Sequence, residues 1–295
     1  MVDILAKEAP SSPEEVTQFF MRVHDAKPGI TERWLEEIKT EDGRSSYAML
    51  CEAGEPLAGK TVVDLACGSG PLTVLLASRV GNSGRVIGVD LNSNELCSAQ
   101  VKFSSAPNVQ FLNESVQQLS LPSSSVDVVL CHMAFMLFNP VKPVVREISR
   151  ILKPGGMFAA LGPALGPTAS LYSELVTKMT GVLREEIAHF ETLSWGQPEA
   201  KTLSGLQQLF STDLDFCAEI QTTDFDLIIR GAPQQLPEKI LQSFYYAALL
   251  SEEGAARLKA EWQTLLEHHK EKDGTVAIPM PRSIFRVSKD SATER

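Results

Sequence analysis

Short apolar runs alternate with segments of helical spacing between residues 60 and 161. The runs occupy residues 61–65, 86–90, 109–112, 126–131 and 157–161, and each has the length of a buried strand. The segments between them repeat apolar side chains every three or four positions, as Leu72, Leu75, Leu76 and Val80 do. Strands that alternate with helices predict a parallel sheet with right-handed crossovers.

The flanking segments follow other patterns. Residues 11–57 are predicted to be helical, with Ser12 as the cap of a helix that opens at Pro13, and with a second helix over residues 31–38. Beyond residue 162 the spacing predicts helices over 170–190, 238–250 and 255–269, an extended stretch over 217–229 and a last strand over 282–288.

A glycine-rich turn joins the first predicted strand to the following helix. It runs from Asp64 to Gly70 and reads DLACGSG. Glycines let a backbone approach a ligand closely, and free N–H groups at a helix start favour a negative group. Thr73 stands where a nicotinamide-binding turn has its third glycine, and Asp64 adds a carboxylate four residues before Gly68. The turn is therefore atypical of nicotinamide-binding proteins.

The pattern Asp64-x-x-x-Gly68-x-Gly70 resembles the first motif of class I methyltransferases that use S-adenosylmethionine. In that family the ligand ends in a zwitterionic methionine, whose carboxylate suits the helix start and whose ammonium suits an acidic neighbour. Three roles for Asp64 stay open: a direct bond to the ammonium, a bond through water, or bracing of the loop.

Two further segments extend the resemblance across residues 60–161. Residues 123–130 (SSSVDVVL) resemble the fourth-strand segment of the family, and residues 152–156 (LKPGG) resemble the turn before its fifth strand. Their order and spacing are similar to the small-molecule group likened to the ubiquinone-biosynthesis methyltransferases. The resemblance implies a Rossmann-like, doubly wound α/β fold with a mostly parallel, seven-stranded sheet.

The same resemblance divides the chain. We expect an N-terminal helical cap over residues 1–57 and an S-adenosylmethionine-binding core over residues 58–162. Residues 163–295 are expected to complete the same α/β domain, with a helical insertion over about residues 231–274 that covers the substrate.

The cofactor contacts follow from these matched positions. Asp90 ends the second strand, where a carboxylate accepts both ribose hydroxyls; the alternative is a charge at the start of the next helix. Family members usually place Asp-Ala after the third strand for the adenine, whereas this chain has Ser115 and Val116 there, with Glu114 one place early. Either Ser115 or Glu114 is then the adenine acceptor. The expected cofactor contacts are Tyr47, Asp64, Ala66, Gly68, Gly70, Asp90, Leu91, Ser115, Val116 and Cys131.

Candidates for chemistry and substrate binding are fewer. His132 follows the fourth strand at the carboxyl edge of the sheet, where ligands of such sheets bind, and is the candidate general base. The alternatives for His132 are packing, a hydrogen bond to a carbonyl, or a contact with the cofactor. His24, Tyr245 and Tyr246 are candidate substrate residues, with ordinary core packing as the alternative.

No metal site is predicted. His268 and His269 are adjacent, so their side chains diverge on a helix and more naturally bond carbonyls at its end. The five cysteines include no CxxC pair, and we interpret them as small core residues of a cytoplasmic protein.

Composition limits the partners. Hydrophobic residues make up 43% and charged residues 22% of the 295 residues, which is typical of a globular protein. The net charge of −10 argues against a surface that follows nucleic-acid phosphates, and no apolar run reaches the length of a membrane span. A homodimer is one open alternative for the assembly.

The leading hypothesis is an enzyme that methylates a small molecule. Residues 131–134 read CHMA rather than the Asn/Asp-Pro-Pro-Tyr/Phe segment of many amino-nitrogen methyltransferases, which favours an oxygen or carbon acceptor. The alternatives are a methyltransferase of protein or RNA, a nicotinamide dehydrogenase, and a protein of the same fold that binds the cofactor without transferring a methyl group.

Overall fold

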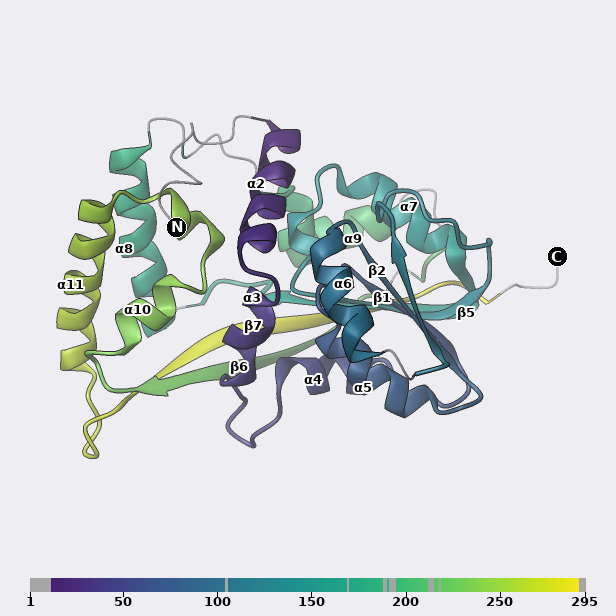
Figure 1. Cartoon of the computed structure of the whole chain (residues 1–295), viewed down its shortest axis with the longest axis horizontal. Coiled ribbons are helices and arrows are strands. Elements are labelled where there is room, and N and C mark those ends of the chain that lie inside the picture. Colours follow the sequence, from purple (N-terminus) through teal and green to yellow (C-terminus); the bar gives the residue numbers. More distant parts are fainter. Residues whose placement is uncertain are drawn as a thin grey trace.

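The computed structural model describes residues 12–103, 106–168, 170–187, 190, 195–211, 215–217 and 219–291. Their strands form one seven-stranded sheet in the order β3-β2-β1-β4-β5-β7-β6 (Figure 1). The parallel strands are β1 (Thr61–Leu65), β2 (Arg85–Asp90), β3 (Val109–Asn113), β4 (Val126–His132) and β5 (Leu152–Pro163). β7 (Val276–Ser288) runs antiparallel to both β5 and β6 (Gln221–Gly231). The predicted fold class is confirmed.

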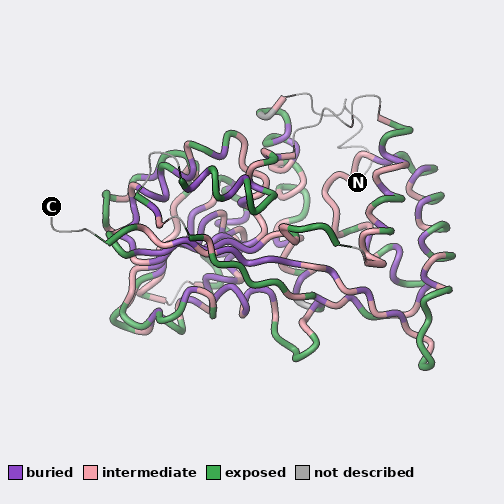
Figure 2. The backbone as a smooth tube through the Cα atoms, turned by 180° about the vertical axis from the view of Figure 1, so that it is seen from behind, coloured by how far each residue is buried: buried purple, intermediate pink, exposed green. Residues whose placement is uncertain are grey.

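Helices cover both faces of this sheet. One face carries α4 (Ser46–Ala53), α5 (Pro71–Val80), α8 (Leu171–Glu186) and α11 (Glu252–His268), which share one apolar cluster with the strands. The other face carries α7 (Val141–Ile151) and α9 (Leu203–Ser211) over a second cluster. Buried residues follow the strands along the length of the sheet (Figure 2). The carboxyl edge of the sheet is thereby held rigidly from both sides.

The N-terminal cap consists of α2 (Pro13–Ala26) and α3 (Ile30–Glu36). The Ser12 hydroxyl accepts a hydrogen bond from the Glu15 N–H at 3.2 Å, which confirms the predicted helix start. α2 packs against α6 (Ser93–Lys102), and in Figure 1 it lies between α6 and the group formed by α8, α10 (Leu236–Leu241) and α11. α4 belongs to the segment predicted as cap, but it packs on β4, β5 and α5 instead.

The C-terminal third departs from its predicted boundaries. The helix predicted over residues 238–250 is wrong: α10 (Leu236–Leu241) and the 3-10 helix η4 (Tyr245–Leu249) stand in its place. The helix is interrupted between them because the Ser243 hydroxyl donates to the Ile240 carbonyl and the backbone of Phe244 is extended. β7 begins six residues before the predicted strand. Pro279 and Pro281 mask its start in the sequence, since proline is normally excluded from inner strands.

The cysteines divide between core and surface. Cys51, Cys67 and Cys131 are buried, as predicted, whereas Cys97 is exposed and Cys217 is half-buried. The core interpretation is therefore wrong for the last two. All five are free thiols.

Candidate active site

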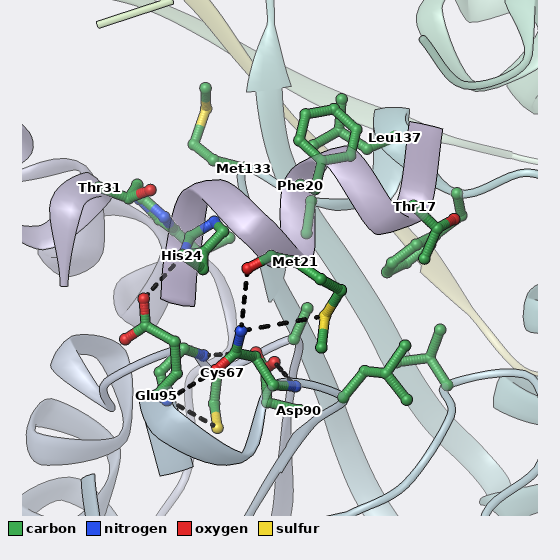
Figure 3. Close-up of a pocket in the computed structure, with 18 of the residues that line it drawn as sticks. Thr17, Phe20, Met21, His24, Thr31, Cys67, Asp90, Glu95, Met133 and Leu137 are labelled. Carbon is green, nitrogen blue, oxygen red and sulfur yellow. Dashed lines mark hydrogen bonds and ion pairs between the residues drawn. The ribbon is translucent and has the colours of Figure 1, made fainter. Parts of the chain in front are cut away.

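A cavity of about 590 Å³ lies at the carboxyl ends of β1, β2 and β4. Its floor comes from the turns that follow these strands, and its roof comes from α2. Figure 3 shows Met21 and His24 of α2 facing Cys67, Asp90 and Glu95 across this space. Parallel α/β sheets bind ligands at this edge, and the volume suits a small organic molecule. We call it the first cavity.

The glycine turn is shaped for close approach. Gly68 has φ +53°, and a Cβ added to it would meet no atom within 4 Å. The Gly68 N–H donates to Asp90 Oδ2 at 2.7 Å, and the Asn92 N–H donates to Asp90 Oδ1 at 2.8 Å. Asp90 therefore fixes the turn while its remaining lone pairs stay available to a ligand.

Gly70 has a different role from Gly68. Its φ is +85°, and a Cβ there would lie 3.0 Å from the Phe103 ring beside α6. It does not line the first cavity. Two residues with side chains also have positive φ at this edge, Ala66 after β1 (58°) and Met133 after β4 (54°), and both line the cavity. Such backbone conformations often mark functional turns.

Two carboxyl groups face each other in this floor. Asp64 is 1% exposed and accepts a hydrogen bond from the Thr73 hydroxyl at 2.6 Å. Burial raises the pKa of Asp64 to about 7, and the nearby Asp90 charge adds to this shift. Burial also raises the pKa of Asp90. A cationic ligand would relieve both carboxylates, because it replaces the lost hydration.

The cap is attached to α6 through Glu95, which is 2% exposed. The Gly29 N–H donates to both Glu95 oxygens at 2.9 and 3.0 Å, and His24 Nδ1 lies 2.7 Å from Glu95 Oε1. Asp25 adds a second attachment, since Asn92 Nδ2 and Asn94 Nδ2 both donate to its Oδ1 at 2.9 Å. These bonds hold the cap over the first cavity.

A chain of polar groups continues from Glu95 across the cap. In the tautomer of His24 that donates from Nδ1 to the Glu95 carboxylate, Nε2 is an acceptor. The Tyr245 hydroxyl lies 3.2 Å from this Nε2 and 2.5 Å from the Thr31 hydroxyl oxygen. Burial raises the pKa of Tyr245 to about 12. His24 and Tyr245, predicted separately as substrate residues, are thus brought into one hydrogen-bonded series.

His132 is 9% exposed beneath the first cavity. Its Nε2 lies 2.9 Å from the Ser46 hydroxyl oxygen, and its ring stacks on Tyr47 with centroids 4.1 Å apart. Burial lowers the pKa of His132 to about 3, and the Arg282 charge adds to this. The geometry favours the packing and hydrogen-bonding alternative, because so weak a base takes protons poorly. The general-base assignment stays a prediction.

A second cavity of about 410 Å³ adjoins the first. Both are lined by Thr31, Met133, Leu137 and Tyr245. The walls of the second come from α3, α8, η4, β7 and the segment around Trp195. Its aromatic side chains are Trp34, Tyr172, Trp195, Phe244, Tyr245 and Tyr246.

The two linings carry opposite charge. The described lining of the first cavity holds five acidic residues and neither Lys nor Arg; they are Glu14, Glu32, Asp64, Asp90 and Glu95. The described lining of the second holds Lys201 and Arg282 and neither Asp nor Glu.

The remaining predicted residues fall into place around these cavities. Leu91, Ser115 and Val116 line the first cavity. Glu114 does not, because its carboxylate accepts hydrogen bonds from the Ser120 N–H at 2.8 Å and the Ser120 hydroxyl at 2.6 Å. Cys131 is fully buried and lines neither cavity. Tyr246 lines the second cavity but not the first.

Several functional candidates escaped the sequence analysis. Glu95 is the third residue after Asn92, which caps α6, and this position accounts for it locally. The sequence therefore carried no sign that Glu95 binds the N-terminal helical cap. Arg282 was the charged first residue of an apolar predicted strand, a signal that could have singled it out. Trp34 and Trp195 had no pattern around them.

The two adjacent histidines at the end of α11 bond backbone carbonyls. His268 Nδ1 lies 2.7 Å from the Thr264 carbonyl oxygen and His269 Nδ1 lies 3.1 Å from that of Leu265, as predicted. The described residues include no group of three or more His, Cys, Asp or Glu placed to hold a metal ion. A search of the described helices finds none long and apolar enough to cross a membrane.

Comparison with known proteins adds an independent line. Residues 62–156 match a family model described as a methyltransferase domain. A demethylmenaquinone methyltransferase of Lactococcus lactis subsp. lactis is 32% identical over an alignment of 162 residues, and the match covers 51% of this chain and 64% of that protein. The chain thus spans just under two thirds of that relative's length. These matches confirm the resemblance predicted from the sequence.

Solved structures share the fold. The YcgJ protein of Bacillus subtilis has a TM-score of 0.57 and 18% identity, and the match covers 84% of this chain and 99% of that one. The [4+2]-cyclase SpnF has a TM-score of 0.57 and 14% identity, with 97% of this chain and 100% of that one covered. A cyclase among the neighbours means that the fold alone does not determine the reaction.

Proposed function

We propose that this chain, whose residues 62–156 match a methyltransferase domain, transfers the methyl group of S-adenosylmethionine to a small molecule at oxygen or carbon. One observation carries the proposal. In the first cavity, Gly68 leaves the backbone open to a ligand, and the Asp90 carboxylate beside it stands where a ribose would bind. Both belong to an acidic lining. That combination suits a nucleoside with a cationic amino-acid end.

S-adenosylmethionine supplies a methyl group on a sulfonium, which is a good electrophile without further activation. Asp90 would accept hydrogen bonds from the ribose hydroxyls, and the positive end of the α5 dipole would favour the carboxylate of the methionine end. Asp64 and Asp90 supply negative potential for the ammonium and sulfonium charges. Ser115 and Val116 lie where the adenine is expected, and Leu91 covers its face.

The acidic lining distinguishes this cofactor from a nicotinamide dinucleotide. A pyrophosphate would meet five carboxyl groups and no Lys or Arg among the described lining residues. Thr73, in place of the third glycine, is buried and bonded to Asp64. A dinucleotide-binding turn needs that position free for close helix packing.

The second cavity is the proposed acceptor site. It meets the first at Tyr245 and Met133, so an acceptor placed there lies beside the cofactor. Proximity is the main catalytic contribution when the acceptor is already deprotonated. An acceptor that arrives with a proton can pass it to the Tyr245–His24–Glu95 series, in which Tyr245 donates to His24 as it receives.

The relatives support a small-molecule acceptor. The Lactococcus lactis relative is named as a demethylmenaquinone methyltransferase, and the net charge of −10 counts against a nucleic-acid acceptor. We further propose a cytoplasmic location, which the five free thiols support. A homodimer remains a proposal that sedimentation analysis tests.

Calorimetry and a transfer assay test the proposal together. S-adenosylmethionine and its demethylated product should bind at about micromolar strength, while NAD should not bind measurably. Methyl-labelled cofactor should pass its label to an aromatic or quinol acceptor. Tight NAD binding without cofactor binding would overturn the proposal. Cofactor binding without label transfer would leave the alternative of a cofactor-binding protein of this fold.

A further inference from the structure

The second cavity contains a buried positive charge that no described residue neutralises. Arg282 is 3% exposed on β7, where it pairs with Pro163 at the end of β5. No carboxylate within salt-bridge distance of it occurs among the described residues. The Tyr172 ring lies below the guanidinium, with 5.5 Å from Cζ to the ring centroid. A buried cation without an anion is costly, so its retention needs a reason.

The hydrogen bonds of Arg282 leave its guanidinium only partly satisfied. Nη1 donates to the Pro281 carbonyl at 2.9 Å, and Nη2 reaches the Met280 sulfur at 3.8 Å, which is a weak acceptor. Nε is buried and has no hydrogen-bond partner among the described residues. A guanidinium presents its N–H groups in parallel pairs, the geometry that matches a carboxylate.

Two more donors in the same lining lack acceptors. Trp34 Nε1 and Trp195 Nε1 are buried and have no partner in the described part of the chain. Both side chains line the second cavity. Buried N–H groups normally find an acceptor, so unpaired donors on three residues that line one cavity indicate side chains that turn toward a ligand when it binds. The aromatic walls indicate that the rest of this ligand is flat and apolar.

We propose that the second cavity binds an aromatic carboxylate as the methyl acceptor and that Arg282 holds its carboxylate. The identification as acceptor rests on the proposed function, whereas the binding of an aromatic carboxylate does not. Arg282 is the specificity-determining residue, and Trp34 and Trp195 belong to the aromatic wall that contacts the ring. A volume of about 410 Å³ fits a molecule of one or two fused rings with substituents.

The wild-type protein provides the first test. 2-Naphthoate and 2-naphthamide have the same rings and nearly the same shape, but only the first carries a carboxylate. Calorimetry at neutral pH should show 2-naphthoate binding at least about ten-fold more tightly, because charge-assisted hydrogen bonds to Arg282 are lost in the amide. Equal affinities, or tighter binding of the amide, would overturn the proposal without any variant.

Arg282→Gln then assigns the preference to its residue. The variant should lose the preference for 2-naphthoate, with the affinity for 2-naphthamide changed by less than about three-fold. Arg286→Gln is the matched control: it removes a charge from the same strand at a residue that lines neither cavity, and it should keep the preference. A preference that survives in Arg282→Gln would contradict the assignment.

Thermal denaturation separates binding from a structural role. Removal of an unpaired buried charge should leave the melting temperature of the ligand-free Arg282→Gln variant unchanged or higher. A lower melting temperature with an intact preference would mean that Arg282 serves folding alone. The demethylated cofactor is titrated in the same samples. Its failure to bind wild-type protein would refute the proposed function, while the 2-naphthoate result would still decide the carboxylate site.

Discussion

The candidate site has an acidic half, which is the first cavity, and a basic half, which is the second cavity. The acidic first cavity is built from turns that directly follow β1, β2 and β4, in the first half of the chain. The basic second cavity combines α3 with Trp195, η4 and β7, which lie far apart in the sequence. Opposite charges in adjoining cavities indicate two ligands of opposite charge, a cation in the first and an anion in the second.

The two cavities also differ in what holds their walls in place. The floor of the first cavity is fixed by backbone, because Asp90 binds the N–H groups of Gly68 and Asn92. The second cavity is bounded by aromatic side chains in mutual contact, among them Trp195 and Tyr246 with ring centroids 5.7 Å apart. Fixed backbone suits an invariant ligand, and packed side chains adapt more easily to different ligands.

Gly68→Val gives the largest expected effect. A side chain at φ +53° strains the turn, and its Cβ projects into open space within reach of the cofactor. Cofactor affinity should fall by more than about a hundred-fold, measured by calorimetry, because strain and steric exclusion add. Binding of 2-naphthoate should persist if the two halves are independent. Loss of both ligands from a folded variant would break the comparison.

Tyr245→Phe tests the boundary between the halves. The hydroxyl that contacts His24 and Thr31 is removed while the ring stays. If it carries the acceptor's proton, turnover should fall about ten-fold to a hundred-fold, with cofactor affinity unchanged. Tyr246→Phe removes the hydroxyl of a residue that lines the second cavity but not the first. It should change only the acceptor's Michaelis constant. Indistinguishable kinetics for the two variants would exclude the proton route.

Asp64→Asn tests how the charge of the Asp64 carboxylate affects the stability of the protein. The pKa of Asp64 is about 7 in the folded protein and about 3.8 when unperturbed. Between these values the folded state holds a proton that the unfolded state releases, so the ligand-free protein loses stability as pH rises through this window. The variant should lack that slope and melt a few degrees higher near pH 8.

The cofactor should respond to Asp64 in the opposite direction. Its cationic end binds the ionised carboxylate, so wild-type affinity should rise several-fold between about pH 6 and about pH 8. The same rise in Asp64→Asn, seen by calorimetry, would show that Asp64 only braces the loop through Thr73.

His132→Gln gives the smallest expected effect. Its imidazole has a pKa of about 3 and is held between Ser46 and Tyr47, so turnover should stay within about three-fold of wild type. The pH profile of turnover should keep its shape. A drop of about a hundred-fold, with the cofactor still bound, would instead support the general-base hypothesis.

The sequence predicted the acidic half far better than the basic half. Its residues stand within a few positions of strand ends, where the periodic pattern of the sheet assigns them to one edge. Asp64, Gly68 and Asp90 could be found because local motifs carry both the turn geometry and the side chains. Gly70 shares that motif, but it lies against Phe103 and does not line the first cavity, so its contact with the cofactor stays a prediction.

The basic half depends on contacts that no local pattern encodes. Arg282 reaches the cavity only because β7 inserts between β5 and β6 in reverse direction, and two prolines conceal the start of that strand. The position of Glu95 near the start of α6 accounts for its presence in the sequence. Its carboxylate nevertheless binds His24 and Gly29, which lie 66 or more residues away in the chain. Long-range pairing of this kind requires the folded chain.

The hairpin of β6 and β7 has an evolutionary consequence. Its long connection contains η4, while β7 carries Arg282 in a register fixed by both neighbouring strands. Substitutions, insertions or deletions in the connection reshape the wall around Phe244 and Tyr246 without disturbing the turns after β1 and β2. Descendants of such a chain can exchange one acceptor for another while they inherit the cofactor site unaltered, and selection on the two sites can proceed separately.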